Sequence, residues 1–308
     1  MRYALLLFIV IFLAGCSQAS YVIIDRESAL PTDREKMTAE MDRSPPILHS
    51  DEYEEPVMLP YPISTAGAED SPFIPESGDE FYFFFTPDVR VPVEKQVIDG
   101  VTGVYVSKIT SAGWTSPERV WLQDPGKLSL DGCAFISGDA LWVCSAREGY
   151  TGLHWVSAER NDGIWKKWKV QDFPPAYEVG ELHMWGDELY FHSSRPGGKG
   201  GTDIWMSMRV DGGWGEPENI EAVNTAENEG MPFITADGQE LWLNRWYQGT
   251  PAVFRSRRQD GKWEEAELII SQFAGEPTLD ASGNVYFVHH YYRDGEMLEA
   301  DIYVAMRK

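Results

Sequence analysis

The feature that most constrains the fold is a repeated pattern whose clearest copy runs from Gly201 to Trp242. This copy contains an alternating strand, an Asp-Gly-Gly turn, a Trp-x-Glu-Pro segment, an Asn-Thr loop, a short apolar strand and an Asp-Gly hairpin. Aspartate-glycine turns between alternating apolar runs are typical of β-hairpins. Each copy therefore predicts four short antiparallel strands.

The spacing of the copies predicts how these units are arranged. Four tryptophans begin equivalent strands at intervals of 51, 49 and 49 residues: Trp114, Trp165, Trp214 and Trp263. A fixed period with four strands in each unit predicts an all-β, five-bladed β-propeller. Its inner strands are expected at 71–74, 133–136, 181–184, 231–234 and 276–279. A run of separate β-sandwiches is the competing fold, but no linker interrupts the period.

One copy of the pattern is displaced to the front of the chain. The segment from Tyr53 to Ile74 matches the segment from Trp214 to Ile234, and the chain ends where the last blade needs such a strand. We therefore expect circular closure, in which an N-terminal strand completes the last blade and leaves neither sheet edge unpaired.

Composition excludes one class of partner. The 26 basic residues against 49 acidic residues give a net charge of -23. Nucleic-acid binding rests on neutralising phosphates with basic groups, so we expect no nucleic-acid partner. Cations or basic surfaces match this charge better.

The N-terminus has the composition of a targeting segment. The apolar run from Tyr3 to Leu13 is too short to cross a bilayer and suits a signal peptide. The following LAGC resembles the bacterial lipobox, which implies lipidation of Cys16 and an extracytoplasmic protein whose lipid is its membrane anchor, with the outer membrane or cell surface favoured. An uncleaved anchor and an ordinary signal peptide are the alternatives.

We accordingly expect a signal peptide at 1–15, a membrane-tethering spacer at 16–52 and the propeller at 53–308. The spacer segment is rich in charges and contains Pro31, Pro45 and Pro46. Such composition favours an extended linker, with a docked N-terminal helix as the alternative.

Two cysteines flank a predicted hairpin. Counting outwards from Gly138 and Asp139 places Cys133 opposite Cys144. A cross-strand disulfide suits an oxidising compartment. A two-residue turn, however, places this pair at the wider, hydrogen-bonded spacing, which fits a disulfide less well, so two buried thiols remain the alternative.

Several phrases, among them RPGGKGGTDIWMSMR, GGWGEPENI and NTAENEGMPFITADGQELWL, resemble the TolB-type, WD40-like propeller repeat of bacterial envelope proteins. The resemblance covers most of 53–308. It implies a propeller that binds other proteins or cell-wall components, and it names no reaction. We therefore expect a binding or scaffold module of the cell envelope, with a protein or a cell-wall polysaccharide as ligand.

Carboxylates recur just before the predicted inner strands. Aligning these positions brings six acids to one end of the channel: Glu69, Asp70, Asp131, Glu181, Glu229 and Glu276. Their repulsion must be relieved by a cation, by basic neighbours or by raised pKa values.

Three interpretations of these acids remain open. They can be structural, pairing with backbone amides or arginines, or they can bind Ca²⁺ or another hard cation through carboxylate oxygens. In the third interpretation, Asp70, Asp131 and Glu181 resemble the Asp, Asp and Glu of five-bladed arabinanases and xylosidases. That resemblance implies a glycosidase, whose chemistry needs a pair of carboxyl groups.

Other candidate ligand contacts lie in the loops. An arginine recurs in each second strand, where pairing with acids such as Asp203 and Asp301 is expected: Arg90, Arg147, Arg195, Arg245 and Arg293. Arg147 and Arg245 become ligand contacts if they point inward. The blade-specific aromatic candidates for stacking on sugars or anchoring a protein are Trp246, Tyr247, His290 and Tyr292. His289 and His290 point to opposite faces of a strand, so both cannot bind one metal without a bend. No zinc-protease, P-loop or Rossmann motif is present.

Overall fold

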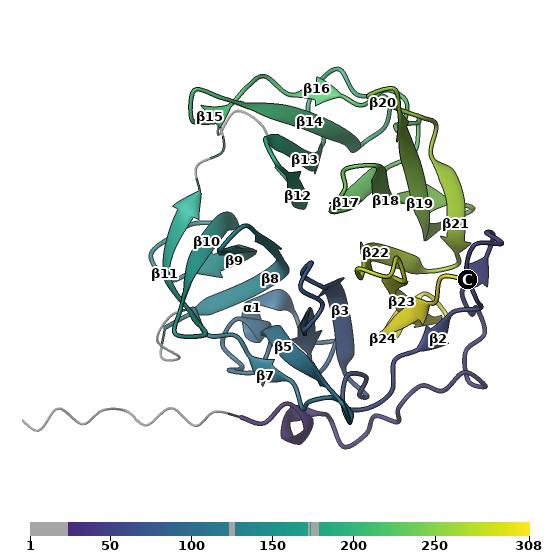
Figure 1. Ribbon diagram of the computed structural model, residues 1–308. Coiled ribbons are helices and arrows are strands. Elements are labelled where there is room, and N and C mark those ends of the chain that lie inside the picture. The colour runs from purple at the N-terminus through teal and green to yellow at the C-terminus, as the bar shows by residue number, and fades with distance from the viewer. Residues whose placement is uncertain (1–23, 123–126, 172, 174–178) are drawn as a thin grey trace, which may run out of the picture.

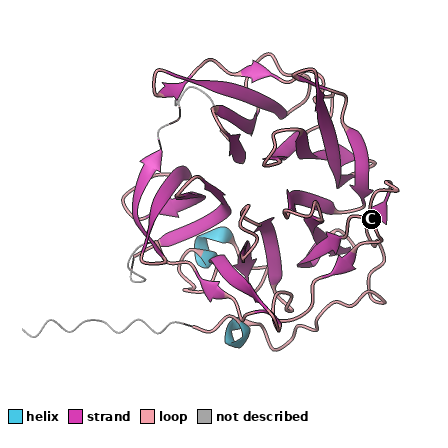
Figure 2. Cartoon of the chain, in the orientation of Figure 1, coloured by secondary structure: helices cyan, strands magenta, loops and turns pink. Residues whose placement is uncertain are grey.

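The computed structural model describes residues 24–122, 127–171, 173 and 179–308, so the predicted signal peptide and Cys16 lie outside the described residues. Within these ranges the protein is nearly all β, as Figure 2 shows, and the helices are the short η1 (Glu27–Ala29) and α1 (Val93–Gln96). Neither is long and apolar enough to cross a membrane.

In the described part of the chain, the strands form five antiparallel meanders around a common centre (Figure 1). The first contains β3 (Ala68–Phe73), β4 (Glu80–Thr86), β5 (Gly103–Thr110) and β7 (Glu118–Arg119). The second contains β8 (Ser129–Ser137), β9 (Ala140–Arg147), β10 (His154–Asn161) and β11 (Ile164–Gln171). The third contains β12 (Leu182–Trp185), β13 (Glu188–Ser193), β14 (Asp203–Val210) and β16 (Glu218–Asn219). The fourth contains β17 (Glu229–Ile234), β18 (Glu240–Tyr247), β19 (Thr250–Gln259) and β21 (Glu267–Ser271). The fifth contains β22 (Ala274–Leu279), β23 (Val285–Arg293), β24 (Glu296–Ala305) and the early strand β2 (Val57–Met58).

The repeated tryptophans stabilise turns at the outer strands. Three of them lie in two-residue strands that fold back on their own meander: β6 (Gly113–Trp114), β15 (Gly213–Trp214) and β20 (Lys262–Trp263). The preceding aspartates adopt positive φ, +50° at Asp211 and +51° at Asp260, as tight hairpins require. An arginine covers two of these rings, with the guanidinium carbon of Arg209 4.3 Å from the centre of Trp214 and that of Arg258 4.3 Å from the centre of Trp263.

The first and last meanders meet at a seam. Strand β24 runs parallel to β3, with Ala300 beside Ala68. Strand β2 pairs antiparallel with β24, placing Val57 opposite Val304. An N-terminal segment thus completes the outer edge of the sheet formed by the end of the chain. The five segments predicted as inner strands lie in or directly beside β3, β8, β12, β17 and β22.

The described part of the predicted spacer differs from the expectation. Residues 24–52, which we call the strap and which appear in purple and dark blue in Figure 1, pack against the meanders. Strand β1 (Ile47–Leu48) pairs with β21, and the side chains of Arg26 and Met37 are buried. The strap is therefore neither a free linker nor a docked α-helix, because its charged side chains find buried partners on the meanders.

A β-bulge recurs in the inner strands. Its first residue has positive φ in four meanders, at Ser71, Cys133, Met231 and Glu276. The register shifts between Gly132 and Phe135, so Gly132 and not Cys133 lies opposite Cys144. The predicted pairing of the two cysteines is therefore wrong in register. Both are free thiols, and their sulfur atoms lie 2.8 Å apart.

Candidate functional site

Aromatic rings close the centre of the molecule. Phe73, Phe135, His183 and Phe233, which we call the plug, project from β3, β8, β12 and β17. The centre of the His183 ring lies 5.2 Å from Phe135 and 4.8 Å from Phe233. Burial lowers the pKa of His183 to about 3, so the ring is neutral, and its Nδ1 accepts a hydrogen bond of 3.2 Å from the Ile234 amide.

The plug separates two cavities, since Phe73, His183 and Phe233 line both. The larger, of about 680 Å³, lies at the ends of the inner strands and is lined by hairpin turns and by Trp185. The smaller, of about 60 Å³, lies where the inner strands begin. We call this end the mouth. The side chains around it include Ser71, Cys133, Glu181, Met231 and Glu276.

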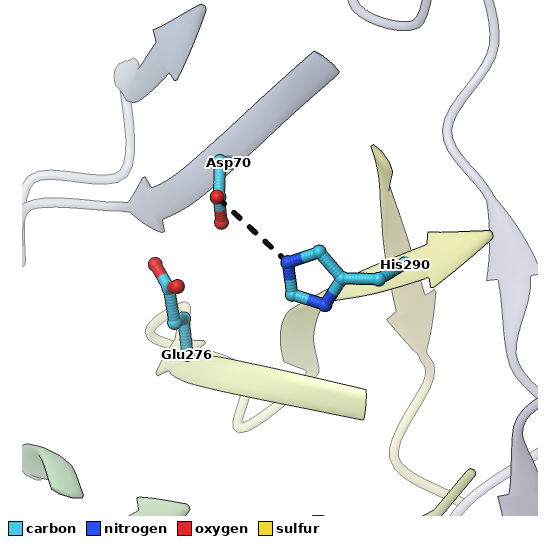
Figure 3. A group of neighbouring side chains, drawn as sticks. All are labelled: Asp70, Glu276 and His290. Carbon is cyan, nitrogen blue, oxygen red and sulfur yellow. Dashed lines mark ion pairs between the residues drawn. The ribbon is translucent and has the colours of Figure 1, made fainter. Parts of the chain in front are cut away.

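Four titratable side chains form the mouth group: Asp70, Glu181, Glu276 and His290. Figure 3 shows three of them converging from β3, β22 and β23. His290 Nε2 lies 3.8 Å from Asp70 Oδ2, and one ligand atom from each of Asp70, Glu276 and His290 falls within 4.8 Å of the others. The Ser71 hydroxyl donates a hydrogen bond of 2.5 Å to Glu276. These atoms are spaced closely enough to surround one cation.

The three carboxyl groups of the mouth group differ in pKa. Burial raises the pKa of Glu181 to about 7, with a further contribution from the negative charge of Asp70. Burial and the charges of Asp70 and Glu181 raise the pKa of Glu276 well above its usual range. Burial also acts on Asp70, but the charge of His290 and the hydrogen bond from the Ser71 amide outweigh it and lower the pKa of Asp70. Asp70 is therefore the most readily ionised carboxyl of the group.

The other three acids of the expected ring do not join the mouth group. Arg245 lies 2.7 Å from Glu229, Arg147 lies 2.7 Å from Asp131, and Arg26 lies 3.2 Å from Glu69. All three acids are buried. Each precedes the bulged position by two residues, and there it meets an arginine and not the mouth. The prediction that six carboxylates share one site is therefore wrong for these three.

This division also separates the residues of the glycosidase hypothesis. Asp70 and Glu181 lie in the mouth group, whereas Asp131 accepts hydrogen bonds from Arg147 at 2.7 Å and Ser145 at 2.5 Å. Among the described residues, no lysine or arginine forms an ion pair with Asp70, Glu181 or Glu276. Of the six acids, those without a lysine or arginine partner in the described chain are thus Asp70, Glu181 and Glu276.

The recurring arginines have partners other than those expected. Asp203 accepts hydrogen bonds from the Gly200 amide and Asn219, and Asp301 accepts one from Lys36, so neither pairs with the arginine column. Arg195 lies over the rings of Phe191 and Trp205. Arg147 and Arg245 are buried in their ion pairs and so do not reach the mouth as ligand contacts.

The aromatic candidates differ in exposure. Trp246 is 48% exposed and Tyr292 is 42% exposed, so both rings are open to a partner. Tyr247 packs against Phe254, and Tyr292 stacks on Phe273 with a centroid distance of 4.9 Å. The adjacent histidines diverge as expected: His289 contacts Asp42 of the strap, whereas His290 faces the mouth.

Sequence reasoning missed the strap residues that bind these meanders. In the fourth meander Arg245 lies opposite Glu229, but in the first meander Phe85 occupies the equivalent position opposite Glu69. Glu69 therefore forms its ion pair with Arg26 of the strap. The sequence contained one indication of this, because the repeat that contains Glu69 has no arginine at the position opposite the acid. The arginine that replaces it, Arg26, lies more than 40 residues upstream, and no local sequence pattern marks it.

No protein-family profile and no curated sequence matches the chain. Among solved structures, it is similar to the endo-arabinase of Bacteroides thetaiotaomicron, with 14% identity and a TM-score of 0.51 over 80% of this chain and 96% of the other. It is also similar to the Bacteroides ovatus xyloglucan PUL protein GH43B, with 14% identity and a TM-score of 0.48 over 81% of this chain and 54% of the other. For TolB from Acinetobacter baumannii, the identity is 10% and the TM-score 0.45, over 80% and 56%.

This chain has a β-propeller fold. At such low identity the likeness extends to the fold and not to a reaction, because propellers with different activities share one architecture. The chemistry must be argued from the mouth group itself.

Proposed function

We propose that this protein is a binding module of the cell envelope, a closed five-bladed propeller that takes its ligand at the mouth. The observation that carries the proposal is the mouth group, in which three acids without a lysine or arginine partner in the described chain meet His290 at a channel closed by the plug. The five meanders and the β2 pairing with β24 support five blades and circular closure.

The mouth group fits a divalent cation or a cationic group of a partner. Calcium prefers a cage of oxygen atoms, whereas an imidazole beside carboxylates suits Mn²⁺ or Zn²⁺. Asp70, Glu276 and His290 offer this mixed set, so we propose Mn²⁺ or Zn²⁺ ahead of Ca²⁺, which was one of the interpretations that the sequence left open. A bound cation would relieve the repulsion among the carboxylates.

The surroundings of the mouth suit an envelope protein or a cell-wall glycan. Trp246 of β18 and Tyr292 of β23 are exposed. Each lies just past the point where its strand pairs with the first residue of the inner strand, β17 or β22. Exposed rings of this kind stack on sugars or anchor a protein partner. Lipidation of Cys16, in line with the lipobox, would hold the propeller at a membrane in an extracytoplasmic compartment.

Co-purification tests this function. The full chain, the Glu276→Gln variant and the Glu265→Gln control would each be captured from solubilised membranes and compared by mass spectrometry. Glu265 is an exposed acid outside the mouth group. We expect the same partner or glycan with wild type and control and its loss with Glu276→Gln. Identical recovery from all three proteins would place binding elsewhere.

A second candidate is hydrolysis of a glycan, favoured by one observation. Glu181 has a pKa of about 7 near Asp70, whose pKa is lowered, and glycosidases need one protonated and one ionised carboxyl. Incubation of the full chain with a polysaccharide panel tests it. Release of reducing sugar that disappears in Glu181→Gln would support hydrolysis, and no release from any substrate would exclude it for that panel.

A further inference from the structure

The repeat places an ion pair between its first two strands, and the fourth meander contains it complete. Glu229 of β17 lies directly opposite Arg245 of β18 in the sheet register. Arg245 donates 2.7 Å hydrogen bonds to Glu229 and to the carbonyl of Val223. Thr225 donates its hydroxyl to the same carboxylate at 2.6 Å.

The first meander keeps the acid but lacks the arginine, which the strap supplies. Glu69 is opposite Phe85, and Arg26 of the strap contacts the carboxylate at 3.2 Å. Arg26 also donates to the carbonyl of Ile63 at 3.0 Å, and Thr65 donates to Glu69 at 2.6 Å. Each contact made around Glu229 in the fourth meander thus has its counterpart around Glu69.

The fifth meander shows the reverse substitution. Ala274 replaces the acid, and His289 stands opposite it, where the fourth meander has its arginine. Asp42 of the strap contacts His289 Nε2 at 3.0 Å, and both side chains are buried. The strap therefore adds a base where the meander has only an acid, and an acid where it has only a base.

A third strap residue, Lys36, provides a positive charge for the buried acids of β24. Lys36 forms ion pairs with Glu299 and Asp301, whose side chains are almost fully buried. In the third meander the equivalent Asp203 is satisfied by the Gly200 amide and by Asn219. The fifth meander has a short turn in place of that loop, and Lys36 provides the donor.

These strap contacts lie directly behind the mouth group. Glu69 and Asp70 are successive residues of β3, and His289 and His290 are successive residues of β23. In each pair the first residue contacts the strap and the second belongs to the mouth, as alternation along a strand requires. The two strands that carry the 3.8 Å Asp70–His290 contact are thus held from behind by Arg26 and Asp42.

We propose that the docked strap is a latch that positions Asp70 and His290, so that release of the strap from the propeller remodels the mouth and weakens its ligand binding. The ligand part of this inference rests on the proposed function. Release leaves the buried Glu69 carboxylate without its cation and with only the hydrogen bonds from Thr65, and it removes the strap partners of the buried His289, Glu299 and Asp301. Strands β3 and β23 must then shift to hydrate these groups. Arg26, Lys36 and Asp42 are positioning residues in this arrangement, since none of them belongs to the mouth group.

The latch is tested by comparing wild type with Arg26→Gln/Lys36→Gln/Asp42→Asn in the full chain. Arg43→Gln, an exposed change within the strap, is the matched control. Hydrogen exchange by mass spectrometry follows β3 and β23, with β17 and β18 as an internal reference. Titration with Mn²⁺ follows the mouth. Asp42→Asn alone, with Asp42→Glu as its rescue, applies the same test with less risk to folding.

We expect the triple variant to lose protection from hydrogen exchange in β3 and β23 but not in β17 and β18. We also expect it to bind Mn²⁺ at least about tenfold more weakly, because loss of the residues that support metal ligands weakens metal affinity by about this factor. Increased exchange of the strap with unchanged β3 and β23 would overturn the latch. If wild type binds no Mn²⁺, the proposed cation site fails, and the exchange pattern alone still supports or refutes the latch.

Discussion

The guanidinium of Arg26 lies 3.2 Å from the carboxylate of Glu69 and takes the place that Arg245 takes beside Glu229. One pair is local, with a sequence separation of 16 positions, whereas the other joins the strap to the first meander across a separation of 43 positions. The same electrostatic requirement is thus met by two different parts of the chain. The part that was expected to be a linker is consequently part of the folded unit.

Replacing Arg26 with Ala tests this requirement. The change leaves Glu69 buried without its cation, and we expect a loss of about 3–5 kcal/mol in the free energy of unfolding. Urea unfolding of the full chain measures it, with Arg293→Ala, an exposed arginine, expected within about 0.5 kcal/mol of wild type. Adding Glu69→Gln to Arg26→Ala should recover part of the loss. Equal, small effects of both arginine changes would show that Glu69 needs no partner.

The raised pKa of Glu181 predicts a pH dependence. Its pKa rises from 4.5 to about 7 on folding, so between these values the folded chain holds a proton that the unfolded chain has lost. The contribution of this residue to stability therefore falls as pH rises through that window. Glu181→Gln mimics the protonated acid and should raise the melting temperature near pH 8 by about 2–4 °C, with little change near pH 4. Thermal unfolding at both pH values measures this. A gain that is equal at both, or larger in acid, contradicts the assignment.

The thiol pair predicts low reactivity. The hydrogen bond shared with Cys144, followed by burial, raises the pKa of Cys133 well above its usual range, so little thiolate is present at neutral pH. We expect iodoacetamide to label Cys133 slowly in the folded protein and rapidly in urea. Peptide mapping separates this site from the other cysteines. Rapid labelling of the folded protein, or recovery of a Cys133–Cys144 linked peptide from reducing medium, would contradict a protected thiol pair.

The fold could be predicted from the sequence because its determinants are local. An Asp-Gly turn such as Asp260–Gly261 and the tryptophan that follows at Trp263 specify a hairpin within a few residues. The displaced copy of the repeat at Tyr53 likewise predicted the pairing of β2 with β24, because this copy contains the outer strand that the last repeat of the sequence lacks.

The site could be predicted only in part. Alignment of the inner-strand entries assigned Glu229 and Glu276 to one ring, but Glu276 occupies the bulged position, whereas Glu229 lies two residues before the bulge at Met231. Glu229 therefore meets Arg245, while Glu276 reaches the mouth. A positive φ at a non-glycine residue has no clear sequence signal. The strap contacts were missed for a different reason, because pairing between distant charges such as Lys36 and Asp301 leaves no periodic pattern.

Calorimetric titration of Mn²⁺ into the full chain tests the central claim, that the mouth group binds a ligand, most directly. We predict one ion for each chain in wild type and in the Glu265→Gln control, and no measurable binding in Asp70→Asn/Glu276→Gln. Circular dichroism would verify that the double variant is folded. Absence of binding in wild type, or equal binding in the folded double variant, would contradict the assignment of the mouth as the ligand site.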